Sequence, residues 1–334
     1  MARDNLLEVK NLKTTFKLED GILTAVNDVS FTVEKNTTLG LVGESGCGKS
    51  VTAFSILRLI PPPGKIEMGE VIFDGEDLLK KSKKEMRRIR GKNISIIFQE
   101  PMTSLNPVFT VGSQIDEVLR LHLGLKGDAA RVKTIELLKE VRIPLPEQRY
   151  REYPHQLSGG MRQRVTIAMA LACSPKLLIC DEPTTALDVT IQAQILELMK
   201  DIQEKTKMSI IFITHNLGVV AKICDRVSVM YAGKIVEQGT VDDIFYNPSH
   251  PYTMGLMRSM PRIDAEEHEA LISIEGTPVD MLNPPEGCGF GTRCEYCMKL
   301  CLKAQPPVVD LGNGHFSKCW LLTLKEKGGE TDGE

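Results

Sequence analysis

One eight-residue segment constrains the fold of this chain more than any other. It reads Gly43-Glu-Ser-Gly-Cys-Gly-Lys49-Ser50, and it lies between the apolar run Thr38–Val42 and a helix-forming stretch, Val51–Leu59. Glycines at this spacing let successive backbone N–H groups turn inward on a phosphate, and the positive end of the following helix adds to the attraction. The segment therefore predicts a strand, a phosphate-binding loop and a helix, in that order.

The side chains of this loop extend the prediction to a nucleotide. Lys49 would reach the β- and γ-phosphates, and the Ser50 hydroxyl would bind Mg²⁺. The alternative is a glycine-rich turn that matches by accident, which the flanking strand and helix disfavour. The same inward N–H groups and Lys49 would favour the thiolate of Cys47 and lower its pKa, and the alternative is that Cys47 is simply a small side chain tolerated there. The candidate phosphate-binding residues are Gly43, Glu44, Ser45, Gly46, Cys47, Gly48, Lys49, Ser50 and Val51.

Further apolar, β-branched runs predict the rest of the domain. Ile94–Phe98, Leu177–Cys180 and Ser209–Thr214 lack polar alternation, as in parallel strands covered on both faces. Apolar residues at helical spacing predict a helix over Thr190–Glu204, so strands and helices alternate and the domain is α/β. Residues from about 86 to 172 are mainly helical in pattern and predict an inserted helical subdomain.

Two other regions predict antiparallel strands beside that sheet. Near the start, Leu6–Leu18 and Leu23–Val33 flank the turn-forming residues Glu19-Asp20-Gly21. Later, Arg226–Gly239 predicts a hairpin that turns at Ala232-Gly233. The first pair is expected to form an antiparallel β-subdomain.

Acidic and polar residues follow three of the predicted parallel strands. Asp181 follows Cys180 and can hold Mg²⁺ through water, and Glu182 can accept a proton from an attacking water. The alternative for Glu182 is a surface charge that caps the next turn. Gln99 and His215 each follow another strand, at the edge where ligands bind in such sheets, although a histidine alone is more often simply packed.

The segment Leu157-Ser158-Gly159-Gly160-Met161 resembles the signature motif of ABC ATPases, in which glutamine usually stands in place of Met161. This departure is mild, because the serine and the two glycines make the phosphate contacts in that family. The resemblance also implies that Phe16 stacks on adenine. The other family motifs occur in the family's order: the phosphate loop, Gln99 as Q-loop, Asp181-Glu182 as Mg²⁺ ligand and base, Ala186-Leu187-Asp188 as D-loop and His215 as switch histidine.

The resemblance has consequences for assembly and for the site. It implies an ABC-type P-loop ATPase core that works as a head-to-tail dimer, as a homodimer or with a sister ATPase. ATP and Mg²⁺ are the implied cofactors, with Ser50, Gln99 and Asp181 around the Mg²⁺. Ser158, Gly159 and Gly160 of one subunit would contact the nucleotide bound by the other. The implied catalytic residues are Glu182, His215, Gln99 and Lys49.

Three other segments narrow the resemblance to ATPase subunits of dipeptide and oligopeptide importers: Gln99–Pro107, Asn247–Thr253 and Gly276–Phe290. Such a subunit drives uptake through two transmembrane permease subunits, and it works indirectly with an extracytoplasmic peptide-binding protein. The implied domains are the ATPase at 1–245, a C-terminal extension at 246–322 and a disordered tail at 323–334.

Other functions stay open at this point. Related importers carry nickel or other small solutes, and a stand-alone ABC ATPase acting on nucleic acid or in Fe–S assembly is a rival hypothesis. A second rival is a metal-sensing module in which ATP only tunes the binding of a partner, against which the intact Glu182 argues.

The extension contains a cluster of cysteines. Cys288, Cys294, Cys297 and Cys301 lie within fourteen residues, and Cys319 follows. The resemblance implies a [4Fe–4S] cluster on Cys288, Cys294, Cys301 and Cys319, leaving Cys297 outside. Four thiolates suit structural zinc equally, and spacing alone does not choose the four, because Cys294, Cys297 and Cys301 would share one face of a helix. The expected role is to hold a small, proline-rich extension together.

Composition bears on the compartment. The net charge of −3 gives no reason to expect a nucleic-acid partner. The first residues lack the apolar core of a secretory signal, and the longest apolar run, Val165–Cys173, is far shorter than the ~20 residues that span a bilayer. We therefore expect a peripheral protein on the cytoplasmic face of the membrane, whose nine cysteines are free thiols or metal ligands rather than disulfides.

Overall fold

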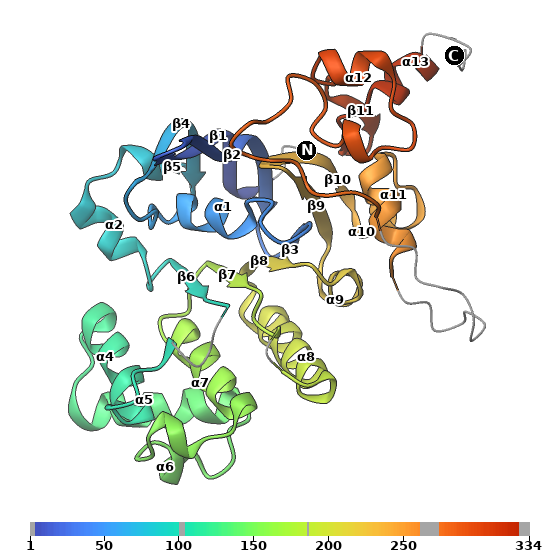
Figure 1. The fold of residues 1–334 in the computed structure, drawn as a ribbon. Coiled ribbons are helices and arrows are strands. Elements are labelled where there is room, and N and C mark those ends of the chain that lie inside the picture. Colours follow the sequence, from blue (N-terminus) through green and yellow to red (C-terminus); the bar gives the residue numbers. More distant parts are fainter. Residues whose placement is uncertain (1–3, 100–103, 186, 261–273, 327–334) are drawn as a thin grey trace. The chain divides into compact units, whose positions relative to one another are not determined.

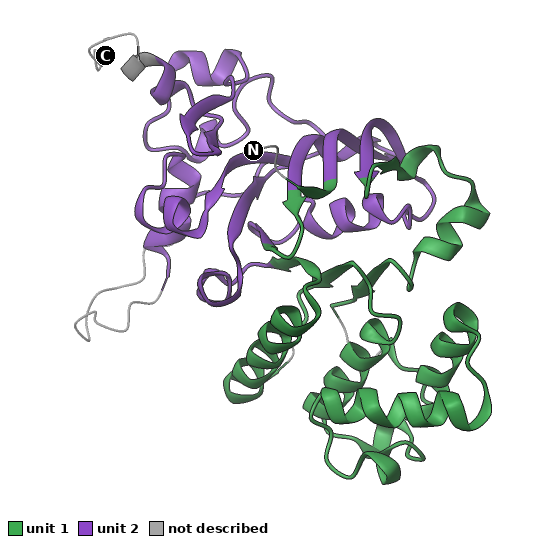
Figure 2. Cartoon of the chain, turned by 180° about the vertical axis from the view of Figure 1, so that it is seen from behind, with its two compact units in different colours: residues 1–7, 33–38, 73–213 green, residues 8–32, 39–72, 214–334 purple. Residues whose placement is uncertain are grey.

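The computed structural model describes residues 4–99, 104–185, 187–260 and 274–326 of the chain (Figure 1). Two compact units make up the chain, and each is assembled from separate stretches of sequence (Figure 2). Unit 1 comprises Met1–Leu7, Val33–Thr38 and Phe73–Ile213, and unit 2 comprises Glu8–Thr32, Leu39–Ile72 and Thr214–Glu334. Stretches that belong to unit 1 and to unit 2 therefore alternate along the sequence.

Unit 2 contains antiparallel and parallel strands. One of its sheets has the order β2-β1-β4, and the two-residue connection between β1 and β2 makes them the expected hairpin. A second set has the order β11-β12-β10-β9-β3, in which β3 and β9 are parallel. The bounds are β1 Asn5–Leu18, β2 Gly21–Glu34, β3 Thr38–Val42, β4 Gly64–Phe73, β9 Arg226–Tyr231, β10 Lys234–Thr240, β11 Val309–Gly312 and β12 His315–Ser317.

The hairpin of β9 and β10 turns where the sequence predicts it. Tyr231 pairs with Lys234, and the two residues between them, Ala232 and Gly233, have φ values of 47° and 76°. Positive φ at both positions is the backbone of the tight turns whose twist matches the flanking strands. The turn therefore carries β10 back antiparallel to β9, as predicted.

Unit 1 contains three parallel strands and the α-helices between residues 83 and 206. Its strands have the order β8-β7-β6, and both pairs are parallel. Helices α4, α5 and α7 contact one another within 111–171, while residues 86–99 hold the end of α2 and strand β6. The bounds are β5 Glu76–Asp77, β6 Ile94–Ile97, β7 Leu177–Asp181, β8 Ser209–Thr214, α2 Lys83–Ile89, α4 Val111–Leu123, α5 Gly127–Glu140, α6 Pro146–Arg149, α7 Gly159–Leu171 and α8 Val189–Thr206.

The spacing of Ile191, Ile195, Leu198 and Ile202 predicts helix α8, and all of these except Ile191, which is half-buried, are buried. Leu196 and Met199 between them are also buried. Residues three and four apart lie on one face of a helix, so these side chains form a continuous apolar stripe. The helix begins at Val189, after the N-cap residue Asp188.

The C-terminal extension is built into the core of unit 2. Strand β12 pairs antiparallel with β10, with Ser317 opposite Glu237, so the sheet continues past the predicted boundary at 245. Phe290 is 4% exposed and belongs to the same core cluster as Tyr231 and Tyr252. The remaining helices of unit 2 are α1 Lys49–Ile56, α9 Leu217–Ile223, α10 Val241–Tyr246, α11 Pro251–Arg258, the 3₁₀ helix η3 Gly291–Arg293, α12 Lys299–Lys303 and α13 Trp320–Glu326.

Two expectations about the ends and the membrane meet the structure here. Helix α13 continues to Glu326, so 323–326 are helical rather than part of a disordered tail, and 327–334 lie outside the described residues. Among the helices of the described ranges, none combines the length and the apolar character that crossing a bilayer requires.

Candidate functional site

The phosphate loop of unit 2 has the predicted strand, loop and helix around it. Gly43 follows β3 with φ 151°, and a Cβ at this position would come within 2.1 Å of the Met230 carbonyl oxygen. A residue with a side chain would therefore have to push the loop away from β9. Helix α1 begins at Lys49 after the N-cap residue Gly48, so the loop ends on the positive end of a helix.

Lys49 is held inside this loop. Its side chain is 5% exposed, and Nζ donates hydrogen bonds to the carbonyl oxygens of Gly43 at 2.8 Å and Glu44 at 2.9 Å. These bonds curl the loop around the ammonium group. The ammonium group thus lies within the predicted phosphate loop.

Cys47 does not behave as its sequence context predicts. Its side chain is 5% exposed, and burial raises the pKa of the Cys47 thiol above its ordinary value. The Lys49 ammonium lowers the pKa, but by less than burial raises it. The expectation of a lowered pKa is therefore wrong, because desolvation of a thiolate outweighs the field of the loop.

This burial predicts slow chemistry at Cys47. Since a raised pKa keeps the thiol protonated, alkylation by iodoacetamide should be slow at neutral pH and should accelerate only at alkaline pH, with or without MgADP. Mass spectrometry of the modified peptides would measure both rates, and the exposed Cys297 serves as the reference thiol in the same sample. Labelling of Cys47 as fast as Cys297 at neutral pH would contradict the burial effect.

In unit 1, the acidic residues lie at the end of β7, as predicted. Asp181 is the last residue of the strand and is 2% exposed. The next residue, Glu182, has φ 47°, and its Oε2 accepts hydrogen bonds from Gln99 Nε2 at 3.1 Å and Thr185 Oγ1 at 3.0 Å. Sequence analysis missed Thr185, although a hydroxyl three residues after a candidate base is a usable signal. The structure thus joins two predicted residues, Gln99 and Glu182, directly.

The signature motif caps a helix of unit 1. Ser158 Oγ accepts a hydrogen bond from the Met161 backbone N–H at 3.3 Å, and α7 begins at Gly159. A Cβ on Gly160 would lie 2.8 Å from Ile191 Cγ2, and the Ile191 N–H donates to Asp188 Oδ1 at 2.9 Å. The signature and the D-loop residue Asp188 therefore lie side by side. Ala186 lies outside the described residues.

The two remaining candidates belong to unit 2. Phe16 is half-buried on β1, and a Cβ on Gly64 would come within 2.5 Å of its ring. His215 is exposed directly after β8, and the next residue, Asn216, caps α9 by accepting from the Gly218 N–H at 2.9 Å. Each unit thus presents its own set of predicted residues.

The donor sets fit Mg²⁺ chemically. The Ser50 hydroxyl, the Asp181 carboxylate and the Gln99 amide offer oxygen atoms, which are the ligands that Mg²⁺ prefers. This ion usually keeps several waters and binds through one or two carboxylates plus substrate phosphates, so it needs no closed protein cage.

The cysteines of the extension gather in the structure, but not on one helix. Helix α12 begins at Lys299, so the expectation that Cys294, Cys297 and Cys301 share a helix face is wrong. The Cys288 N–H donates to the Cys301 carbonyl oxygen at 2.6 Å, which joins the two ends of the cluster. A Cβ on Gly287 would lie 2.1 Å from that oxygen, so only glycine permits this approach.

Four of the five cysteines line one small cavity: Cys288, Cys294, Cys301 and Cys319. Cys297 is exposed, and its Sγ lies 3.7 Å from the Met298 carbonyl oxygen. Burial and the neighbouring thiols raise the pKa of Cys294 to about 12 and that of Cys319 to about 11, so a metal would have to displace protons to bind here.

The thiols are not arranged as a finished metal site. In the part of the chain that the structure describes, no group of three or more His, Cys, Asp and Glu side chains is placed to hold a metal ion. The type and number of donors therefore suit a metal–thiolate centre, whereas their spacing does not form one.

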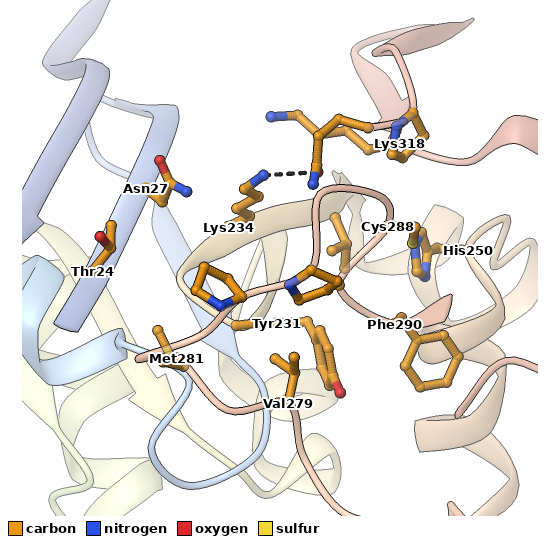
Figure 3. Close-up of a pocket in the computed structure, with 17 residues that line it drawn as sticks. Thr24, Asn27, Tyr231, Lys234, His250, Val279, Met281, Cys288, Phe290 and Lys318 are labelled. Carbon is orange, nitrogen blue, oxygen red and sulfur yellow. Dashed lines mark hydrogen bonds between the residues drawn. The ribbon is translucent and has the colours of Figure 1, made fainter. Parts of the chain in front are cut away.

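A second cavity borders the same cluster. It lies between the β9–β10 turn and the segment 279–290, and Cys288 and His250 line it together with Tyr231 (Figure 3). At its polar end Lys234 Nζ donates to Gln305 Oε1 at 2.7 Å, and burial lowers the pKa of Lys234. Cys288 thus connects the cysteine cluster to a cavity that is also lined by the turn after β9.

The fold and the phosphate loop define an ATPase of the ABC class, and comparison with known proteins agrees. Residues 26–185 match the family model described as ABC transporter. The dimeric ATP-binding cassette MJ0796, solved in a post-hydrolysis state with ADP and Pi, is 28% identical with a TM-score of 0.63. That match covers 70% of this chain and 98% of the solved one.

Closer relatives narrow the group. The oligopeptide transport ATP-binding protein OppD of Bacillus subtilis is 57% identical over 95% of this chain and 89% of its own length. The dipeptide transport ATP-binding protein DppD of the same organism is 53% identical over 95% of each chain. Residues 236–301 match the family model described as oligopeptide/dipeptide transporter, C-terminal region. The chain therefore belongs to the ABC transporter ATP-binding proteins that carry this C-terminal region.

Family membership confirms several predictions from the motifs. The ABC-type α/β core is confirmed, as is the classification of the protein as an ATP-binding ABC ATPase.

Proposed function

We propose that this protein hydrolyses MgATP to power the import of oligopeptides or dipeptides through partner membrane subunits. The observation that carries the proposal is 57% identity, over 95% of the chain, to an oligopeptide transport ATP-binding protein. The match of residues 236–301 to the oligopeptide/dipeptide transporter C-terminal region supports the peptide class over nickel or other solutes.

In this proposal the phosphate loop holds the triphosphate. Backbone N–H groups within residues 43–51, other than that of Glu44, which donates to Tyr252, bind the β- and γ-phosphates together with the Lys49 ammonium, and Phe16 stacks on adenine. Ser50, Asp181 and Gln99 would supply oxygen ligands to Mg²⁺, which would neutralise phosphate charge when bound. The buried position of Lys49 supports its role, because a fixed cation needs no reorganisation when the phosphate arrives.

Glu182 acts as the general base. The two hydrogen bonds that its Oε2 accepts from Gln99 and Thr185 would orient the carboxylate for its role as base. His215 would sense the γ-phosphate as the switch histidine. Ser158, Gly159 and Gly160 would meet the nucleotide of a second ATPase subunit, since the N-terminus of α7 is an anion-binding end with an exposed serine at its cap.

The cysteine cluster would hold a metal centre that orders the extension. The four cysteines of the family pattern line one cavity and Cys297 does not, which supports that choice of ligands. A [4Fe–4S] cluster is the proposed centre, and structural zinc is the alternative that thiolate chemistry allows. Either centre would require the sulfur atoms to move closer together.

The proposed partners follow from the importer role. They are a second ABC ATPase, identical or a sister chain, and two transmembrane permease subunits, with an extracytoplasmic peptide-binding protein acting indirectly. The protein would then lie on the cytoplasmic face of the membrane. The dimeric state of the similar MJ0796 cassette supports the dimer.

Co-purification and transport test this proposal. Affinity-tagged protein expressed in its host should co-purify with two permease subunits, and the assembly in proteoliposomes should show ATPase activity that rises with binding protein and peptide. Lys49→Ala is the matched inactive control, because it removes the cation from the loop. Stimulation by nickel but not by peptide, or co-purification with nucleic acid alone, would reject the peptide importer.

A further inference from the structure

A guanidinium from the C-terminal extension is bonded to the phosphate loop. Arg293 ends η3, directly before Cys294, and its side chain is 4% exposed. Its Nη1 donates to Glu44 Oε2 at 2.8 Å and its Nη2 donates to Glu44 Oε1 at 3.0 Å. This is the bidentate arrangement in which an arginine–carboxylate pair is strongest.

The other donors of Arg293 are also used. Nε donates to the Glu275 carbonyl oxygen at 3.0 Å, and Nη2 also donates to the Ile274 carbonyl oxygen at 3.2 Å. The guanidinium lies 5.9 Å from the ring centroids of both Tyr231 and Phe290. These hydrogen bonds and ring contacts hold the guanidinium in place independently of Glu44.

Glu44 is held a second time through its main chain. Its backbone N–H donates to the Tyr252 hydroxyl at 2.9 Å, and Tyr252 lies on α11 in the buried core. Glu44 is the second residue of the phosphate loop, and its carbonyl oxygen also accepts from Lys49. Residues beyond position 250 therefore hold both the side chain and the backbone of a loop residue.

The Arg293–Glu44 pair also offsets a negative charge inside the phosphate loop. An unpaired carboxylate in the phosphate loop would repel the triphosphate, and at short range in a partly buried site such repulsion is only weakly screened. Glu44 is 26% exposed, so solvent screens its negative charge only in part. Pairing with Arg293 cancels this charge.

We propose that Arg293 is a positioning residue for nucleotide binding: it neutralises and fixes Glu44, so the C-terminal extension sets the affinity of the phosphate loop. This inference rests on the proposed nucleotide role of the loop and adds a regulator to it. Arg293 reaches no reacting atom in this scheme. Its influence passes through Glu44.

The competing explanation is that Arg293 only anchors the extension. Charge separates the two explanations, because Glu44→Gln keeps an acceptor for Arg293 but removes the negative charge. In the proposed role, Arg293→Ala should raise the Kd for MgADP about tenfold, whereas Glu44→Gln should lower it, because the loop then keeps the Arg293 charge without the opposing carboxylate. The double variant Arg293→Ala/Glu44→Gln should return to within about threefold of wild type, because no unpaired carboxylate remains.

The experiment is titration calorimetry of full-length protein with MgADP, followed by steady-state ATPase kinetics. Arg293→Ala should raise KM for ATP more than it lowers kcat, and Arg293→Lys should fall between wild type and Arg293→Ala. The matched control is Arg258→Ala, which removes an exposed arginine of the same extension that pairs with Glu295 at 2.7 Å. Its Kd should stay within about twofold of wild type.

The outcomes are separable. Wild-type protein that does not bind MgADP would reject the proposed function, not this inference. With wild-type binding intact, the inference is overturned by an unchanged Kd in Arg293→Ala or by a double variant as weak as Arg293→Ala. If Arg293→Ala does not fold, Glu44→Gln still decides, since a loss of affinity there would show that the pair acts by anchoring alone.

Discussion

Replacing Glu182 by glutamine is expected to leave nucleotide binding intact and to slow ATP hydrolysis by about 10²- to 10⁴-fold, the usual worth of a general base. The amide cannot accept the proton of the attacking water. Its oxygen can still accept hydrogen bonds from Gln99 and Thr185, so the surrounding geometry should survive. The variant should therefore accumulate as an ATP-bound dimer.

Phosphate release under single-turnover conditions and MgADP titration would measure the two effects separately. Glu136→Gln is a matched control on the same unit, since Glu136 is exposed on α5 and pairs with Lys133. It should behave as wild type in both assays. Turnover of Glu182→Gln at the wild-type rate would remove Glu182 from the mechanism, and loss of binding would show that the substitution had damaged the site.

Replacing a single cysteine of the cluster by serine is expected either to abolish the proposed metal centre or to leave it intact, depending on the position. Cys288, Cys294, Cys301 and Cys319 line one cavity, so replacing any of them should abolish the metal centre. Cys297 lies outside that cavity and is exposed, so Cys297→Ser should keep the metal. Anaerobically purified wild-type protein should be brown with broad visible absorption for a [4Fe–4S] cluster, and colourless with stoichiometric zinc for the alternative.

Loss of the centre should loosen the extension more than it slows the isolated ATPase, because the phosphate loop and signature lie before the extension in the chain. Proteolysis of the extension and metal analysis would report the first effect. Arg293 directly precedes Cys294 and is bonded to Glu44, so we also expect a higher Kd for MgADP in Cys294→Ser than in Cys297→Ser. Metal-free wild-type protein purified anaerobically, or Cys297→Ser as damaged as the other four, would contradict this prediction.

Local patterns predicted the elements of this protein well. Strands β3 and β8 have the predicted bounds, and the hairpin of β9 and β10 turns at Ala232-Gly233. Apolar runs, glycine spacing and helix caps act over a few residues, and the backbone conformations that they favour are largely decided there. Because these patterns are local, the strand, loop and helix around the phosphate loop and the acidic residues at the end of β7 could be predicted from the sequence.

Electrostatic surroundings were predicted less well. The pKa of Cys47 is raised rather than lowered, because burial depends on what packs over the loop, and no spacing in the sequence reports that.

The path of the cysteine-rich segment was also predicted wrongly. Cys294, Cys297 and Cys301 have helical spacing, yet α12 begins only at Lys299. Backbone bonds such as that between Cys288 and Cys301 determine the path of this segment instead.

The sequence by itself determined the class of this protein, since its motifs are short and ordered and their chemistry needs only residue types at fixed spacing. The tertiary structure decided which distant residues meet. Arg293 and Glu44 are separated by 249 positions, and no pattern within either segment points to the other. Their pairing exists because β12 extends the sheet at β10 and Phe290 enters the core beside Tyr231, which brings the residue before Cys294 against the phosphate loop.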